Sequence, residues 1–268
     1  MKLIVLRGGP ALAAAAPLPK SPLAEPATTS RHGALALSDQ GEQWVLLNIA
    51  PNVASQLQSD PALCGHQGLQ QGEVRTVLLT DAQVDHIGGL LSLRDGPPIN
   101  LYATPAVFEV LSQTMPVLQM LQQFCGVHWH VIPVAGETLS ATFRVAALPE
   151  LEFTALATDS PVPRGLGALE VPASTGLSIA LAVRDPRTGQ RLFCAPGAQA
   201  LGAAPYDWLC SADCVLLDEH TTWPEAAVNE AEAWLAQRKV LFGDAPTLSN
   251  PGNAGGFEAA RDGMVIEL

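Results

Sequence analysis

The chain has 268 residues, of which 48% are hydrophobic and 15% charged, so it can bury a core and carries too little charge for a disordered chain. Its 26 acidic and 14 basic residues give a formal net charge of −12, which argues against nucleic acid and membrane-surface partners. No apolar run approaches the roughly 18 residues of a spanning helix. Five cysteines without a close CxxC pair argue against a disulfide framework or zinc knuckle and favour a reducing cytoplasm.

The first residues predict a short strand rather than a secretory signal. The apolar run at residues 3–6 is broken by Arg7, whereas a signal needs about 7–15 continuous apolar residues. Residues 10–29 contain five prolines and predict a long, irregular connection.

Short apolar runs bounded by Gly, Asn, Pro or Asp predict most of the strands that follow. They lie at residues 34–38, 43–49, 76–80, 100–104, 127–134, 142–148, 152–158, 176–184, 191–195, 214–218, 240–242 and 264–268. We expect the first two to form a hairpin through residues 39–41. Strands in two runs with interspersed helices predict sheets covered by helices on their outer faces, a layered α/β or α+β domain.

Apolar residues at helical spacing predict four helices. We expect them after Pro51-Asn52, after His86, over residues 107–121 with a kink at Pro116, and over residues 225–239. The last begins with Glu and ends with Arg-Lys, as the helix dipole favours.

The most informative stretch follows the strand at residues 76–80. It delivers four polar side chains to a turn and a helix: Asp81, Gln83, Asp85 and His86. Side chains at strand ends are well placed to line a pocket. The spacing resembles the His-x-His-x-Asp-His metal motif of the metallo-β-lactamase superfamily. Asp81 and Gln83 stand where its first two histidines would be, while Asp85 and His86 match it.

The substituted motif resembles the PqqB family, coenzyme PQQ biosynthesis protein B. Further blocks agree at residues 48–52, 195–197, 212–218 and 262–264. The chain departs from that family in three places. No cysteine occurs in residues 10–27, where members carry a Cys-x-Cys-x-x-Cys zinc site, so no N-terminal structural zinc is expected. A Gly-His motif downstream of Asp218 is missing, and residues 241–244 offer glycine or aspartate where a histidine is expected.

A carboxylate-rich set with few imidazoles remains to bind a metal. Its members are Asp85, His86 and Asp218, with Asp81, Gln83, His220 and Asp244 as further candidates. Carboxylate with imidazole suits Fe(II), Mn(II) or Zn(II), and two histidines with one carboxylate would suit non-haem iron. In the alternative, structural interpretation, Asp81 and Asp85 cap the following helix, whose start favours carboxylates.

Other candidate residues have simpler interpretations. His128 and His130 share one face of a strand, which allows a ligand pair, but a half-exposed strand face explains them better. Cys194 and Cys214 lie in apolar strands and are expected to be small buried residues. The chain contains no Gly-x-Ser-x-Gly elbow, Walker loop or dinucleotide fingerprint, so the corresponding enzyme classes are unsupported.

The resemblance implies one αββα sandwich over residues 1–268, with two mixed sheets, outer helices and a pocket at one sheet edge. It implies a metal-dependent oxygenase that hydroxylates a tyrosine- or peptide-derived precursor in quinone-cofactor or peptide natural-product biosynthesis. In that scheme Asp85, His86 and Asp218 hold Fe(II), with Zn or Mn as alternatives, and Asp85 and His86 are catalytic. A binding or carrier protein without metal is the second hypothesis, and a hydrolase is the third. Whether the protein forms a homodimer is left open by the sequence.

Overall fold

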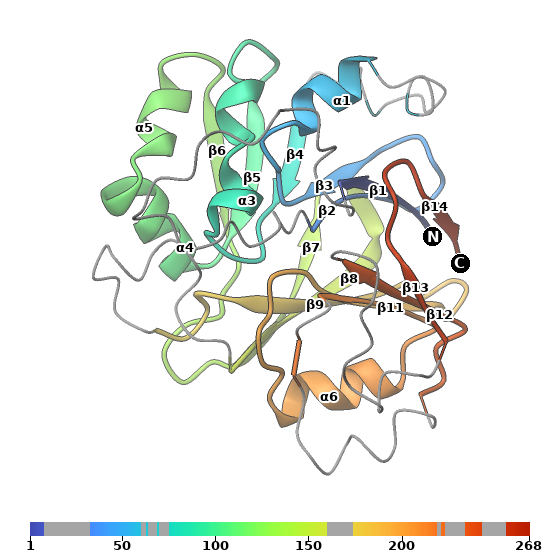
Figure 1. The fold of residues 1–268 in the computed structure, drawn as a ribbon. Helices are drawn as coiled ribbons and strands as arrows, with labels where there is room; N and C mark the ends of the chain where they lie inside the picture. The colour runs from blue at the N-terminus through green and yellow to red at the C-terminus, as the bar shows by residue number, and fades with distance from the viewer. Residues whose placement is uncertain are drawn as a thin grey trace, which may run out of the picture.

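Two seven-stranded sheets packed face to face form the centre of the protein (Figure 1). The computed structural model describes residues 1–7, 33–59, 63, 69, 75–159, 174–218, 221–222, 234–242 and 256–268. Within these residues, helices cover the outer face of each sheet, so the layers run helix, sheet, sheet, helix. The predicted αββα sandwich is confirmed.

The first sheet joins the first half of the chain to its last strand. Its order is β14-β1-β2-β3-β4-β5-β6. It is antiparallel from β14 to β3 and parallel from β3 to β6, and the predicted hairpin is formed by β2 and β3. Its strands are β1 Lys2–Arg7, β2 Ala34–Ser38, β3 Val45–Leu47, β4 Arg75–Leu78, β5 Ile99–Ala103, β6 Val127–Val131 and β14 Val265–Glu267.

The second sheet repeats this arrangement with the second half of the chain. Its order is β13-β12-β11-β10-β9-β8-β7, antiparallel from β7 to β10 and parallel from β10 to β13. Its strands are β7 Ser140–Val145, β8 Leu148–Ala157, β9 Ile179–Arg184, β10 Arg191–Ala195, β11 Cys214–Asp218, β12 Arg238–Phe242 and β13 Phe257–Ala259.

Three apolar clusters hold the layers together. Strand residues alternate between them: Val77 packs under the helices, and Leu78 packs against the other sheet. The first sheet is covered by α1 Val53–Ser59, α3 Val84–Ile87, α4 Pro105–Glu109 and α5 Val117–Gln122, and the second by α6 Ala203–Cys210. None of the helices in the described part of the chain is long and apolar enough to cross a membrane.

The helix expected after His86 begins earlier than predicted. It starts at Val84 as α3 and is followed by a separate 3-10 helix, Leu90–Leu93. Gly89 lies between the two helices, and its backbone is so close to Ala50 that a Cβ would overlap the Ala50 carbonyl. His86 therefore lies within the first helix rather than before it.

The two longer predicted helices have different outcomes. The interruption predicted at Pro116 is confirmed, although it is a full break and not a kink: the π-helix Val110–Thr114 ends before it and α5 begins after it. The helix predicted over residues 225–239 is wrong at its C-terminal end, where Arg238–Phe242 forms β12, while residues 223–233 lie outside the described residues. Parallel pairing with β11 and β13 on both sides of this buried strand outweighs the helix-like charge pattern.

Arg187, in the turn between β9 and β10, links the two sheets at their outer turns. Its guanidinium donates to the two Asp185 oxygens at 3.2 and 3.1 Å, and its backbone N–H donates to Asp185 at 2.9 Å. Its Nη2 also lies 3.7 Å from the Asp39 carboxylate in the β2–β3 turn. Hydrogen bonds from Arg187 hold the pKa of Asp185 below its ordinary value, although burial opposes this shift.

Replacing Asp185 with Asn is expected to lower the free energy of unfolding at neutral pH by about 1–2 kcal/mol, because bonds to a charged acceptor are stronger. Since the folded-state pKa is depressed, this contribution is fully present above the ordinary aspartate pKa of about 3.9. It is lost as the pH falls through the folded-state pKa. Urea unfolding at neutral and acidic pH measures the difference between the two proteins. A difference that does not shrink in acid would contradict this role.

Candidate functional site

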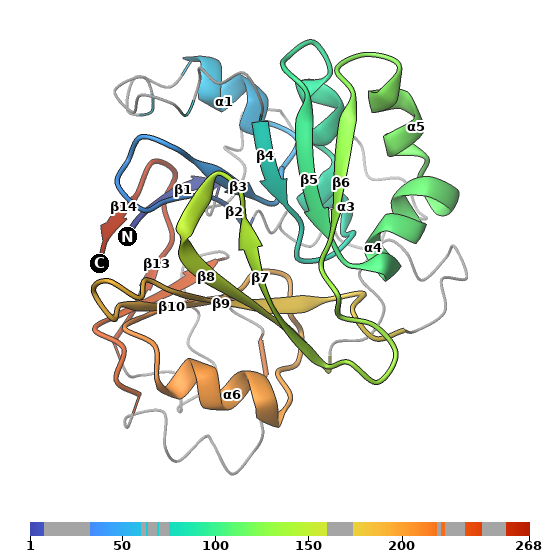
Figure 2. The same ribbon diagram turned by 180° about the vertical axis from the view of Figure 1, so that it is seen from behind.

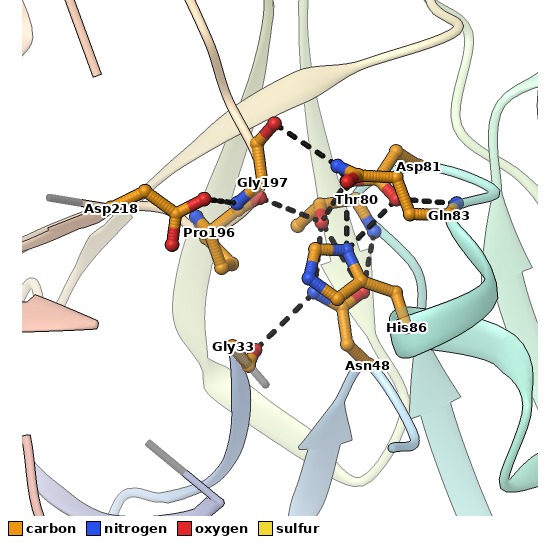
Figure 3. Close-up of polar contacts among 9 residues, drawn as sticks. All are labelled: Gly33, Asn48, Thr80, Asp81, Gln83, His86, Pro196, Gly197 and Asp218. Atoms are coloured by element: carbon orange, nitrogen blue, oxygen red, sulfur yellow. Dashed lines mark hydrogen bonds and ion pairs between the residues drawn. The ribbon is translucent and has the colours of Figure 1, made fainter. Parts of the chain in front are cut away.

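The parallel halves of the two sheets end at one shared edge of the sandwich. Strands β3 and β4 of the first sheet lead into Asn48 and Thr80, and strands β10 and β11 of the second lead to Pro196 and Asp218. Figure 3 shows these strand ends facing one another, with α3 beside them. Loops at the carboxyl ends of parallel strands commonly carry the ligand site of such folds, so this edge is the candidate functional site.

Asn48 fixes the geometry of the loop that enters the site. It is fully buried and has a positive φ of 56°, a conformation that Asn adopts more readily than most residues. Its Oδ1 accepts the Thr80 N–H at 3.0 Å, and its Nδ2 donates to Thr80 Oγ1 at 2.9 Å. The ends of β3 and β4 are thereby held together by one side chain.

Asp81 and His86 form a buried pair at the centre of the site. Asp81 has no exposed surface, and Nδ1 of His86 lies 2.8 and 2.9 Å from its two carboxylate oxygens. The Gln83 N–H also donates to Asp81 Oδ1 at 2.8 Å. Helix α3 begins after Gln83 without a side-chain cap, so Asp81 orients the imidazole instead of capping the helix.

Gly197 joins the two sheets across the site (Figure 3). Its carbonyl accepts from Gln83 Nε2 at 3.0 Å, and its N–H donates to Asp218 Oδ2 at 2.8 Å. Gly197 has a φ of 77°, and a Cβ there would overlap Gln83, His86 and Asp81. Only glycine lets this backbone approach the pair so closely.

The charges around His86 favour its protonated form. Burial of the ring lowers its pKa, but the hydrogen-bonded Asp81 carboxylate, with the charges of Asp218 and Asp85, outweighs this effect and raises the pKa. Since Asp81 also accepts N–H donors as a carboxylate, Nδ1 of His86 carries the proton that faces it. Nε2 is the ring nitrogen left for a ligand. It lies beside Gly33, 3.4 Å from the place that a Cβ of this glycine would take.

The donor chemistry fits a metal in one respect and falls short in another. A carboxylate on Nδ1 is the arrangement with which proteins orient a metal-binding imidazole, and Asp81 supplies it to His86. Among the described residues, however, no three His, Cys, Asp or Glu side chains gather where they could hold one ion. His220 and Asp244 lie outside the described residues. The described residues therefore orient one imidazole for metal binding but do not by themselves complete a metal site.

The structure brings together four of the predicted site residues: Asp81, Gln83, His86 and Asp218. Asp85 is half-buried in the first turn of α3. The ligand roles assigned to these residues stay predictions. The roles of Asn48, Thr80 and Gly197 were missed, although Asn48 and Gly197 lie in blocks that carry the family resemblance.

The other histidines and cysteines that the sequence singled out are explained by packing. On β6, His128 is exposed, while His130 stacks on Tyr102 with ring centroids 4.4 Å apart and bonds to Asn100 at 3.2 Å. This agrees with a half-exposed strand face. Cys194 and Cys214 are buried free thiols, and burial raises the pKa of each to about 12. They are inert packing residues.

Comparison with known proteins assigns the fold to one class of proteins. The family model of the beta-lactamase superfamily domain matches residues 43–243. Zn(2+)-bound PqqB from Methylobacterium extorquens superposes with a TM-score of 0.66 at 26% identity, over 88% of this chain and 87% of that one. Human tRNase Z, short form, shares the fold with a TM-score of 0.62 at 18% identity, over 100% of this chain and 99% of that one. The chain is a member of the beta-lactamase superfamily.

Curated relatives define the family within that class. Coenzyme PQQ synthesis protein B from Klebsiella pneumoniae is 37% identical over 199 residues, which is 74% of this chain and 62% of that protein. The relative of the same name from Azotobacter vinelandii is 35% identical over 276 residues, covering 90% of this chain and 89% of that protein. The chain belongs to the coenzyme PQQ synthesis protein B family, as its motifs predicted. It spans 62% of the length of the Klebsiella relative.

Replacing Gly197 with Ala is expected to destabilise the protein, because the added Cβ overlaps three site residues. Gly126 provides a matched control, since it has the same φ of 77° and nothing within 4 Å of its Cβ position. The control should lose about 1–2 kcal/mol from the left-handed backbone alone. Gly197→Ala should lose about 1–3 kcal/mol more from overpacking. Urea unfolding of both variants measures this, and equal losses would contradict the close approach.

Two substitutions of Asn48 separate its backbone role from its side-chain role. Asn48→Gly keeps the positive φ but leaves the buried Thr80 N–H without its acceptor, at a cost of about 1–3 kcal/mol. Asn48→Ala should cost about 1 kcal/mol more, because alanine resists this conformation. Unfolding free energies of the two variants test the order. An alanine variant as stable as the glycine variant would refute the backbone role.

Proposed function

We propose that this protein acts in PQQ biosynthesis, on a tyrosine- or peptide-derived precursor bound at the edge that holds Asp81 and His86. The observation that carries this proposal is the 35% identity that extends over 89% of the Azotobacter vinelandii relative, coenzyme PQQ synthesis protein B. The site supports it, because a buried carboxylate–imidazole pair lies at the strand ends where this fold places its ligands.

We further propose that the reaction is a metal-dependent hydroxylation, with His86, Asp85 and Asp218 as ligands. A Zn(2+)-bound relative of this fold supports metal binding, and the carboxylate and imidazole donors also suit Fe(II) or Mn(II). Bound iron would supply the activation of O₂. A hydroxylation puts one oxygen atom on the substrate carbon and reduces the other to water, with two electrons and two protons from an external reductant.

The described residues have a defined part in this proposal. Asp81 holds the His86 ring through Nδ1, so that Nε2 faces away from the carboxylate. Gly197 keeps Asp218 at a fixed place opposite through its N–H. Neither the contact of Asp81 with His86 nor that of Gly197 with Asp218 requires a metal. These contacts therefore orient the two candidate ligands before any metal binds.

A binding or carrier protein without metal is the second candidate. The observation that favours it is the lack, among the described residues, of three ligand side chains that meet at one point. In that case the Asp81–His86 pair would serve as a polar anchor for a substrate and not as part of a metal site.

We also propose a reducing, cytoplasmic location. It is supported by the four cysteines of the described residues, Cys125, Cys194, Cys210 and Cys214, which are all free thiols.

Metal content tests the proposed function directly. Protein loaded anaerobically with Fe(II) and desalted is expected to retain close to one iron per chain by elemental analysis, and to consume O₂ with a tyrosine-containing peptide and a reductant. His86→Ala should lose the iron. Asp81→Asn should bind it about 10–100-fold more weakly, because the amide orients the imidazole less well.

His128→Ala is the matched control, because it removes an exposed imidazole on β6 away from the site. It should keep both the iron and the O₂ consumption. Iron retained at the wild-type level by His86→Ala would show that the assigned site is wrong. A wild-type protein that holds no metal under any loading condition would exclude the hydroxylase and leave the carrier, which peptide binding would then test.

A further inference from the structure

Arg75 lines a pocket at the end of β4 that is remote from Asp81. It is the first residue of β4, whereas Asp81 follows the last. Helix α1 lies beside the start of this strand (Figure 2), and residues of α1 and of the 3-10 helix Leu90–Leu93 line the pocket. Its volume is about 380 Å³, within the range of small-ligand sites. None of the described residues that line it belongs to the Asp81–His86 site.

Arg75 is half-buried, and its nearest charge partner in the described part of the chain is the Cys125 thiol, whose pKa is raised by burial. Among the described residues, no carboxylate forms a close ion pair with its guanidinium. Other arginines there pair closely, such as Arg144 with Glu152 at 2.9 Å and Arg187 with Asp185 at 3.1 Å. Burial lowers the pKa of Arg75, which is the signature of a partly desolvated cation. Removing a charge from water without a partner costs free energy, so an anion that reached this guanidinium would recover part of that cost.

The walls of the pocket combine apolar and polar groups. The apolar part is formed by Ala54, Leu57 and Leu93, which are buried. Gln58 and Ser92 add an amide and a hydroxyl. Gly96 lies next to the guanidinium, since Nη1 of Arg75 is 3.7 Å from the place that a Cβ of Gly96 would take.

Among the described residues, Asp95 is the acidic group that borders the pocket. Its side chain is 76% exposed and lies 3.6 Å from the Arg94 guanidinium. Together with the net charge of −12, this carboxylate disfavours ligands that carry two or more negative charges.

We propose that this pocket binds a small monocarboxylate with an apolar body, its carboxylate on the Arg75 guanidinium and its hydrocarbon against Leu57 and Leu93. The paired N–H donors of a guanidinium match the two oxygens of a carboxylate. A single negative charge satisfies Arg75 without the repulsion from Asp95 that a phosphate dianion would meet. The pocket lies on the helix-covered face of the first sheet, so ligand binding there is independent of whether the other site holds a metal.

Hexanoate is the probe for this site, and titration calorimetry measures its binding to the full chain. The wild-type protein is expected to bind it saturably. Arg75→Leu should weaken the affinity at least about 10-fold, while Arg184→Leu, which removes an exposed arginine at the end of β9 away from the pocket, should leave it unchanged. Hexan-1-ol, with the same hydrocarbon and no charge, should bind the wild-type protein at least about 10-fold more weakly than hexanoate.

Thermal unfolding without hexanoate distinguishes a ligand-binding arginine from a structural one. Arg75→Leu should be at least as stable as the wild type, because it removes a partly buried charge that has no close carboxylate partner among the described residues. Arg75→Gln, which is neutral and polar, repeats the comparison.

The proposal would be overturned by a loss of the folded state in both variants, by equal hexanoate affinities of wild type and Arg75→Leu, or by the lack of saturable wild-type binding. Equal competition by inorganic phosphate would overturn the choice of a carboxylate.

Discussion

A carboxylate with no exposed surface, that of Asp81, is the constraint on which the site depends. An ionised group buried alone would cost several kcal/mol, and here donors surround both oxygens. They come from Thr80 Oγ1, the Gln83 backbone and side-chain amides, and the His86 ring. Three of these donors lie on the turn into α3 and on α3 itself, so that segment must pack tightly on the strand end. Gly89 permits this packing, because without a side chain it lets the end of α3 approach the loop at Ala50.

The site is a property of the sandwich and not of either sheet. Each sheet is antiparallel in one half and parallel in the other, and the two parallel halves send their loops to the same edge. The first sheet supplies Asp81 and His86, and the second supplies Asp218. Gly197 connects them with one carbonyl and one N–H. A sliding of one sheet on the other would therefore change the separation of the imidazole and the facing carboxylate.

Local sequence patterns predicted the strands and the turn that carries Asp81, Gln83, Asp85 and His86, because those features depend on neighbours within a few residues. Contacts between distant segments were beyond such patterns. The bond of Gln83 to Gly197 joins residues 114 positions apart. The helix α6 and the strand β13 were not predicted either, since α6 begins in a Gly- and Pro-containing stretch and β13 has only three residues. Sheet pairing also decided the conformation of Arg238–Phe242 against its helix-like charges.

The pairing of β1 with β14 has a consequence for how the protein is made. β1 lies between β2 and β14, and in its pairing with β14, Leu3 lies opposite Ile266. During synthesis, one edge of β1 therefore stays without its partner until almost the whole sequence has left the ribosome. An uncovered apolar edge invites pairing with other chains, and the interval lasts on the order of ten seconds or more at an elongation rate of about 20 residues per second. Translation speed and chaperone binding thus bear directly on the yield of folded protein.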